Sequence, residues 1–149
     1  MERTEVLKQF EKSKDNLINI LHALQNNNPQ NYLDQDDLKE VANYLNITYS
    51  HVYGVVSYYT MFSLNPRGKY IIRVCNSPVC NMEKSTEIIK EIMNLLSIKV
   101  DETTTDNRFT LELSECLGQC DTAPGMMINE DVLGNLNIEN LKSIFDKYN

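Results

Sequence analysis

The amino-acid sequence predicts an α/β (α+β) protein of two domains, a helical bundle in residues 1–65 and a sheet-containing domain in residues 66–149. Three observations lead to this prediction. Apolar residues in the first part recur at helical spacing. The second part has the order strand, helix, strand, strand, helix, which suits an open sheet with helices packed against it. Between the two parts, Asn65, Pro66, Arg67 and Gly68 form a turn.

Three helices are expected before this turn. The first carries leucines at helical spacing and ends at the asparagine run and proline of residues 26–29. The second follows Asp34 and has an apolar stripe. The third is expected to start at Ser50, a residue type that caps helices, and to continue through residue 62. Its apolar residues surround the helix almost completely, so we expect it to be buried or docked on another surface.

The second part begins with a strand over residues 69–74, followed by a helix over residues 83–96. Residues 101–107 form a polar loop, and residues 109–113 alternate like a half-buried strand. Residues 126–128 and 132–136 flank an Asn-Glu-Asp turn and are expected to form a hairpin. Asn137 is expected to cap a final helix that runs through Tyr148.

Composition excludes several functions. The chain has 14 Lys and Arg against 21 Asp and Glu, a net charge of −7, and no basic face that would neutralise phosphates, so nucleic-acid binding is not expected. No stretch approaches the ~20 apolar residues of a membrane helix. The N-terminal residues are charged where a signal peptide needs an apolar core, so we expect a cytoplasmic protein. No G-x-G-x-x-G or P-loop pattern is present, so no flavin, nicotinamide or nucleotide site is visible.

Four cysteines are the candidate functional residues. Cys75, Cys80, Cys116 and Cys120 have the spacing C-x4-C, then 35 residues, then C-x3-C. In a reducing compartment such a pattern indicates metal or redox chemistry, because structural disulfides are disfavoured there. Each pair follows a predicted strand, and the loops at the carboxyl ends of strands are where α/β folds bind ligands. Gly118 allows the second loop to curl around a cofactor.

Spacing alone leaves three possibilities for these thiols. A 2Fe–2S cluster takes four thiolates, and the wide loops of this spacing can reach two different irons. Structural zinc also accepts four thiolates, although most zinc-binding pairs use C-x2-C. The thiols can also be unliganded. A thioredoxin-type dithiol is not expected, because no C-x-x-C is present.

Several longer motifs accompany the cysteines. They are S-x-V-Y-G-V-x-x-x-Y over residues 50–59, F-S-L-x-P-R-G-K over 62–69, I-R-V-C over 72–75 and C-L-G-x-C-x-x-A-P over 116–124. Together they resemble the thioredoxin-like 2Fe–2S subunit of NADH dehydrogenase assemblies, found in respiratory complex I, NAD-linked and electron-bifurcating hydrogenases and NAD-linked formate dehydrogenases. The segment between the first two cysteines departs from the family, which usually has small or glycine residues where this chain has residues 76–79.

The resemblance implies a thioredoxin-like 2Fe–2S ferredoxin domain after the helical bundle, with Cys75, Cys80, Cys116 and Cys120 as the ligands of one 2Fe–2S cluster. It implies an electron-transfer subunit without a catalytic site of its own. The partners would be a flavoprotein that holds FMN and reacts with NAD(H), and further iron–sulfur subunits. Hydride transfer gives flavin two electrons, which clusters accept singly.

The sequence favours one of these assemblies. Its 18 asparagines and many Lys and Ile residues fit a bacterium with an AT-rich genome, and among such bacteria we favour a soluble electron-bifurcating NAD-linked hydrogenase. The alternatives are respiratory complex I and NAD-linked formate dehydrogenase. Two further classes are a free-standing thioredoxin-like ferredoxin and a zinc-stabilised interaction module.

Overall fold

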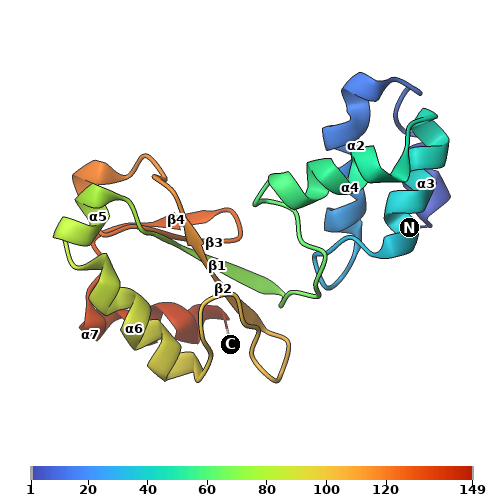
Figure 1. The fold of residues 1–149 in the computed structure, drawn as a ribbon. Coiled ribbons are helices and arrows are strands. Elements are labelled where there is room, and N and C mark those ends of the chain that lie inside the picture. The colour runs from blue at the N-terminus through green and yellow to red at the C-terminus, as the bar shows by residue number, and fades with distance from the viewer. Residues whose placement is uncertain (1, 149) are drawn as a thin grey trace. The chain divides into compact units, whose positions relative to one another are not determined.

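The computed structural model describes residues 2–148. The chain forms two compact units, residues 1–67 and 68–149 (Figure 1). Arg67 belongs to the first unit, because its backbone N–H donates to Gln30 O at 2.7 Å and its Nε donates to Asn31 O at 2.8 Å. Gly68 N–H donates to Thr110 Oγ1 of the second unit at 2.7 Å. The division therefore lies two residues after position 65.

The first unit is helical. Its elements are α1 (Arg3–Leu7), a 3₁₀ turn (Lys14–Asn16), α2 (Leu17–Asn27), α3 (Gln35–Leu45) and α4 (Tyr49–Tyr58). They enclose a core of leucine, isoleucine and valine side chains. Helix α4 begins earlier than predicted, because Thr48 and not Ser50 is its N-cap, with Thr48 Oγ1 accepting from His51 N–H at 3.3 Å.

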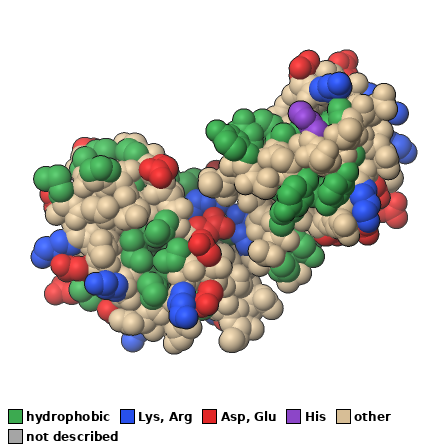
Figure 2. Space-filling model, viewed as in Figure 1, with side chains coloured by type: hydrophobic (Ala, Val, Ile, Leu, Met, Phe, Trp, Pro, Cys, Tyr) green, Lys and Arg blue, Asp and Glu red, His purple; other side chains and the backbone are tan. Residues whose placement is uncertain are grey.

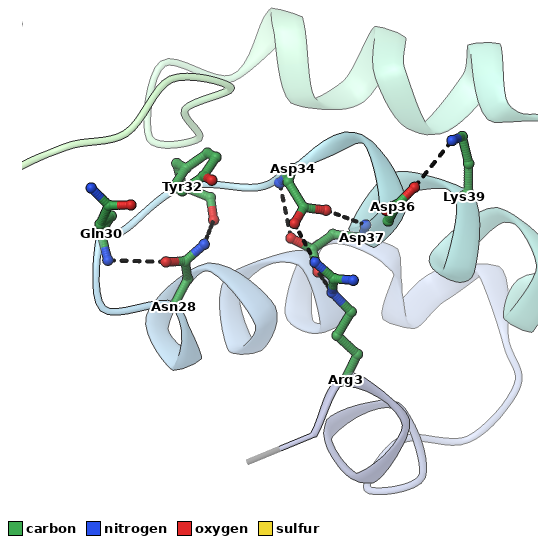
Figure 3. Close-up of polar contacts among 8 residues, drawn as sticks. All are labelled: Arg3, Asn28, Gln30, Tyr32, Asp34, Asp36, Asp37 and Lys39. Carbon is green, nitrogen blue, oxygen red and sulfur yellow. Dashed lines mark hydrogen bonds and ion pairs between the residues drawn. The ribbon is translucent and has the colours of Figure 1, made fainter.

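Polar contacts at the start of α3 tie it to α1 (Figure 3). Asp34 caps α3, with its Oδ1 accepting from Asp37 N–H at 2.8 Å, while Asp37 Oδ2 accepts from Asp34 N–H at 2.9 Å. Arg3 of α1 reaches both carboxylates: its Nε donates to Asp37 Oδ1 at 2.6 Å, and its Nη2 pairs with the Asp34 carboxylate. Because Asp37 is buried, this arginine supplies the partner that a buried carboxylate requires.

The second unit contains a four-stranded sheet in the order β2-β1-β3-β4. Strand β1 (Tyr70–Cys75) pairs in parallel with β2 (Phe109–Ser114) and antiparallel with β3 (Met126–Ile128), which forms a hairpin with β4 (Asp131–Leu133). Helices α6 (Ser85–Leu96) and α7 (Ile138–Phe145) lie next to each other against the sheet (Figure 1). The predicted order of strand, helix, strand, strand, helix is confirmed, as is the mixed fold class.

The sequence prediction lacked α1 in the first unit and a short helix in the second. A short helix, α5 (Pro78–Met82), precedes α6, so the single helix expected over residues 83–96 is preceded by a separate turn of helix. Pro78 occupies its first turn, where a missing N–H costs nothing. Among the described residues no helix has both the length and the apolar character needed to cross a membrane.

Candidate metal centre

The first thiol lies where β1 ends. Cys75 is the last residue of this central strand and only 2% of it is exposed. Its N–H donates to Gly125 O at 3.0 Å, and its carbonyl accepts from the buried Ser85 Oγ at 2.5 Å. The next residue, Asn76, donates its N–H to Ser114 O at 2.9 Å. Three hydrogen bonds, to Gly125, Ser85 and Ser114, therefore fix the backbone next to this sulfur.

The second thiol comes from α5. Cys80 is 3% exposed and lies in α5, close enough to Cys75 that each thiol shifts the pKa of the other. The N–H of Gly125 donates to the Cys80 sulfur. Gly125 thus bonds to both cysteines of this pair, through its carbonyl to one and through its N–H to the other.

The second pair follows β2 and is open to solvent. Cys116 and Cys120 are both exposed, and their sulfur atoms are 3.6 Å apart. Between them Gly118 has a φ of +78°, a left-handed conformation that glycine adopts without strain. This turn directs Gly118 N–H toward Cys116 Sγ, at 3.4 Å. The expectation that Gly118 lets the loop curl is confirmed at the level of the backbone.

The two loops meet at the end of the sheet. Because β1 and β2 are parallel and adjacent, Cys75 pairs with Ser114, two residues before Cys116. The N–H of Leu117 in the second loop donates to the Cys75 sulfur in the first. The structure therefore brings the four predicted thiols to one place, as two close pairs whose sulfurs interact across the loops.

The electrostatics of the four thiols differ. Burial acts to raise the pKa of Cys75, but the N–H groups of Ser77 and Leu117 and the thiol of Cys80 outweigh it, and the pKa lies below its ordinary value. Burial and the neighbouring Cys75 raise the pKa of Cys80. The hydrogen bond to Cys116, followed by its charge, raises the pKa of Cys120. Cys75 is thus the thiol that ionises most readily of these three.

This donor set fits a 2Fe–2S cluster. Each iron of such a cluster takes two cysteine thiolates besides the bridging sulfides, and the chain offers two close thiol pairs. The N–H of Gly118 points at Cys116 Sγ, and the backbone N–H groups of residues 77, 117 and 125 act to lower the pKa of the two buried thiols, as groups that stabilise thiolates do. Within residues 2–148, no group of three or more His, Cys, Asp and Glu side chains is arranged to hold one metal ion.

Sequence reasoning missed the residues that support the thiols. Ser77, Ser85 and Gly125 contribute hydrogen bonds to the cysteines, and none was singled out. A signal existed for the first of them, since serine followed by proline is typical of an N-cap and first helical position, and it predicts the start of α5. No local pattern indicates the other two, because their role depends on how distant segments pack.

A comparison with protein-family models decides the identity of the fold. The model of the thioredoxin-like [2Fe-2S] ferredoxin family matches residues 3–149, which is nearly the whole chain. This chain belongs to the thioredoxin-like [2Fe-2S] ferredoxin family. The resemblance found in the sequence and the 2Fe–2S cofactor expected from it are thereby confirmed.

Two relatives resemble the chain over most of its length. It is 41% identical over 117 residues to a subunit of NADH-quinone oxidoreductase from Rickettsia prowazekii (strain Madrid E), a match that covers 78% of this chain and 66% of the relative. It is 31% identical over 147 residues to the HndA subunit of the NADP-reducing hydrogenase from Solidesulfovibrio fructosivorans, covering 99% of this chain and 85% of the relative. The chain thus spans about two thirds of the Rickettsia protein.

A solved structure shares the fold. The crystal structure of NAD⁺-reducing [NiFe]-hydrogenase in the air-oxidized state matches with a TM-score of 0.79 at 20% identity, over 99% of this chain and 24% of that chain. By their names, both relatives are subunits of oxidoreductases that use NADH and quinone or NADP. The general prediction of an oxidoreductase subunit is supported by these names.

Proposed function

We propose that this chain is the electron-transfer subunit of an NAD(H)-dependent oxidoreductase, in which Cys75, Cys80, Cys116 and Cys120 hold one 2Fe–2S cluster beside the FMN of a partner flavoprotein. The observation that carries the proposal is the meeting of two thiol pairs at the end of the sheet, with backbone N–H groups directed at the sulfurs. A bound 2Fe–2S cluster supplies one-electron transfer.

The chain's own residues would do three things in this role. The buried pair, Cys75 and Cys80, would keep water from one side of the centre. The N–H groups of Ser77, Leu117 and Gly125 would stabilise the negative charge on the sulfurs, which grows when an electron arrives. The loops leave the other pair at the surface, where a partner can come close enough to exchange an electron.

The assembly we favour is a soluble electron-bifurcating NAD-linked hydrogenase. Support comes from the hydrogenase subunit of Solidesulfovibrio fructosivorans, whose match extends over 99% of this chain and 85% of its own length. The alternative is the same subunit in respiratory complex I, which the higher identity to the Rickettsia relative supports. The purified complex separates them: the hydrogenase would use the electrons of hydrogen to reduce both NAD⁺ and a low-potential one-electron acceptor, whereas complex I would oxidise NADH and reduce a quinone.

The ligand assignment is tested with the full chain purified without oxygen. We expect about two irons and two acid-labile sulfides per chain, red-brown colour, and an electron paramagnetic resonance signal after reduction. Cys116→Ser should lose most of the visible absorption, whereas Leu95→Ser, at an exposed position on α6, should keep it. Zinc without iron or sulfide in the wild-type chain would refute the proposal and favour a zinc-stabilised module.

A further inference from the structure

One buried hydroxyl of the second unit has no hydrogen-bond partner. The atom is Ser114 Oγ, at the end of β2, which is closed off from solvent and bonded to no atom of the described residues. Within residues 2–148, Glu40 Oε2 of the first unit is the other side-chain oxygen in this state. A buried hydroxyl gives up its bonds to water and needs a replacement. The replacement for Ser114 must come from a group that the chain itself does not supply.

Ser114 lies beside the thiols. In the register of the sheet it is the partner of Cys75, and residues paired on adjacent strands have their side chains on the same face. Its carbonyl accepts from Asn76 N–H at 2.9 Å, which ties the end of β2 to the first cysteine loop. Two residues further along the chain is Cys116. The unpartnered hydroxyl is therefore located between the segments that carry the two thiol pairs.

The neighbouring side chains on this face are engaged with each other. The pair before Cys75 and Ser114 in the register is Arg73 and Glu112. Arg73 Nε donates to Glu112 Oε2 at 3.1 Å, so this carboxylate already has a charged partner. The acceptor for Ser114 is thus expected on the side of the thiols and not further down the strand.

The thiol loops have no cationic side chain to offset negative charge. Residues 74–83 and 109–141 contain no Lys or Arg, and the second unit as a whole has 8 of them against 13 Asp and Glu. On the face that Figure 2 shows, acidic and basic side chains of this unit are interspersed. Negative charge at the four sulfurs must therefore be stabilised by neutral hydrogen-bond donors, which makes each donor important for the reduction potential.

We infer that the Ser114 hydroxyl donates a hydrogen bond to a sulfur of the bound 2Fe–2S cluster and raises its reduction potential, an inference that rests on the proposed function. Sulfur bound to iron carries negative charge and accepts hydrogen bonds. One-electron reduction increases this charge, and hydrogen bonds to charged acceptors are the stronger ones. The hydroxyl therefore stabilises the reduced form more than the oxidised form. Ser114 takes no electron itself, and it sets the potential at which one is accepted.

The test measures the midpoint potential of the loaded full-length chain, by redox titration followed with electron paramagnetic resonance. Ser114→Ala removes the hydroxyl, while Ser114→Val and Ser114→Thr have nearly the same shape and differ in the hydroxyl. Branched side chains suit a strand, so both should fold. At a fixed potential we expect Ser114→Ala and Ser114→Val to lower the ratio of reduced to oxidised cluster about tenfold, a midpoint about 59 mV lower for one electron. Ser114→Thr should titrate like the wild type.

The matched control is Ser143→Ala, which removes an exposed hydroxyl from α7 and should leave the potential unchanged. Pulsed electron paramagnetic resonance after exchange into D₂O gives a second readout, since one exchangeable proton coupling should be missing from Ser114→Ala and Ser114→Val. A wild-type potential in both of these variants, or an equal fall in Ser114→Thr, would overturn the inference alone. Absence of iron and acid-labile sulfide from the wild-type chain would overturn the proposed function as well.

Discussion

Gly134 supports the loop that carries Cys120, and replacing it with alanine tests that support. A Cβ at Gly134 would lie 2.4 Å from Thr122 Oγ1, 2.7 Å from Thr122 Cβ and 2.8 Å from Thr122 O. Thr122 cannot move alone, because its carbonyl accepts from Asn135 N–H at 2.5 Å and its N–H donates to Gln119 O at 3.1 Å. The added methyl group must therefore displace the turn Cys120–Thr122.

The size of the effect follows from overpacking. Forcing an extra methyl group into a packed site costs about 1–3 kcal/mol. For a unit of this size, 1 kcal/mol corresponds to roughly 4–8 °C, so Gly134→Ala should lower the melting temperature by about 4–24 °C. Because the displaced turn begins at Cys120, iron content and the visible circular dichroism of the loaded protein should also change.

The assay compares thermal unfolding, iron content and visible circular dichroism in anaerobically purified variants. Gly54→Ala is the matched control, since it makes the same chemical change at a helical position where the new methyl group meets no described atom within 4 Å. The reasoning would be refuted by a Gly134→Ala protein that melts at the wild-type temperature and holds iron with an unchanged spectrum.

Three further predictions concern other contacts. Ser85→Ala leaves the buried Cys75 carbonyl without its hydroxyl donor, and urea titration should show a loss of about 1–3 kcal/mol in the free energy of unfolding. Asp34→Ala removes the N-cap of α3 and should cost about 1 kcal/mol in the same assay. Burial, then the hydrogen bond and charge of Asp131, raise the pKa of Tyr148 from 10.0 to about 12. The neutral Tyr148 hydroxyl therefore adds to the free energy of unfolding in full below pH 10, and this contribution is lost as the pH rises towards 12. The melting temperature of Tyr148→Phe should therefore fall less over this range than that of the wild type.

The elements that could be predicted from sequence are those whose pattern is local. The helix from Asn137 and the hairpin of β3 and β4 follow directly from a capping residue and a turn. The four cysteines could be singled out because their spacing and their position after strands are also local features. Fold class and cofactor followed from the same patterns and from the motifs that surround them.

The other features depend on contacts between residues that are far apart in the sequence. Helix α5 is five residues long, too short for apolar periodicity to reveal it. Gly125 reaches both cysteines of the first loop only because β3 pairs with β1, a register that the sequence does not display. For α4, the apolar residues around the whole helix predicted a helix that is buried or docked on another surface; the structure buries one stripe and exposes the remainder.

The unequal exposure of the two thiol pairs has a consequence for chemical modification. Cys75 and Cys80 are buried, while Cys116 and Cys120 lie in water. A water-soluble alkylating agent added to iron-free protein meets the second pair first, and mass spectrometry of peptides should find label on residues 116 and 120 before residues 75 and 80. Reagents in solution thus reach the centre through Cys116 and Cys120, whereas Cys75 and Cys80 stay inaccessible as long as the unit remains folded.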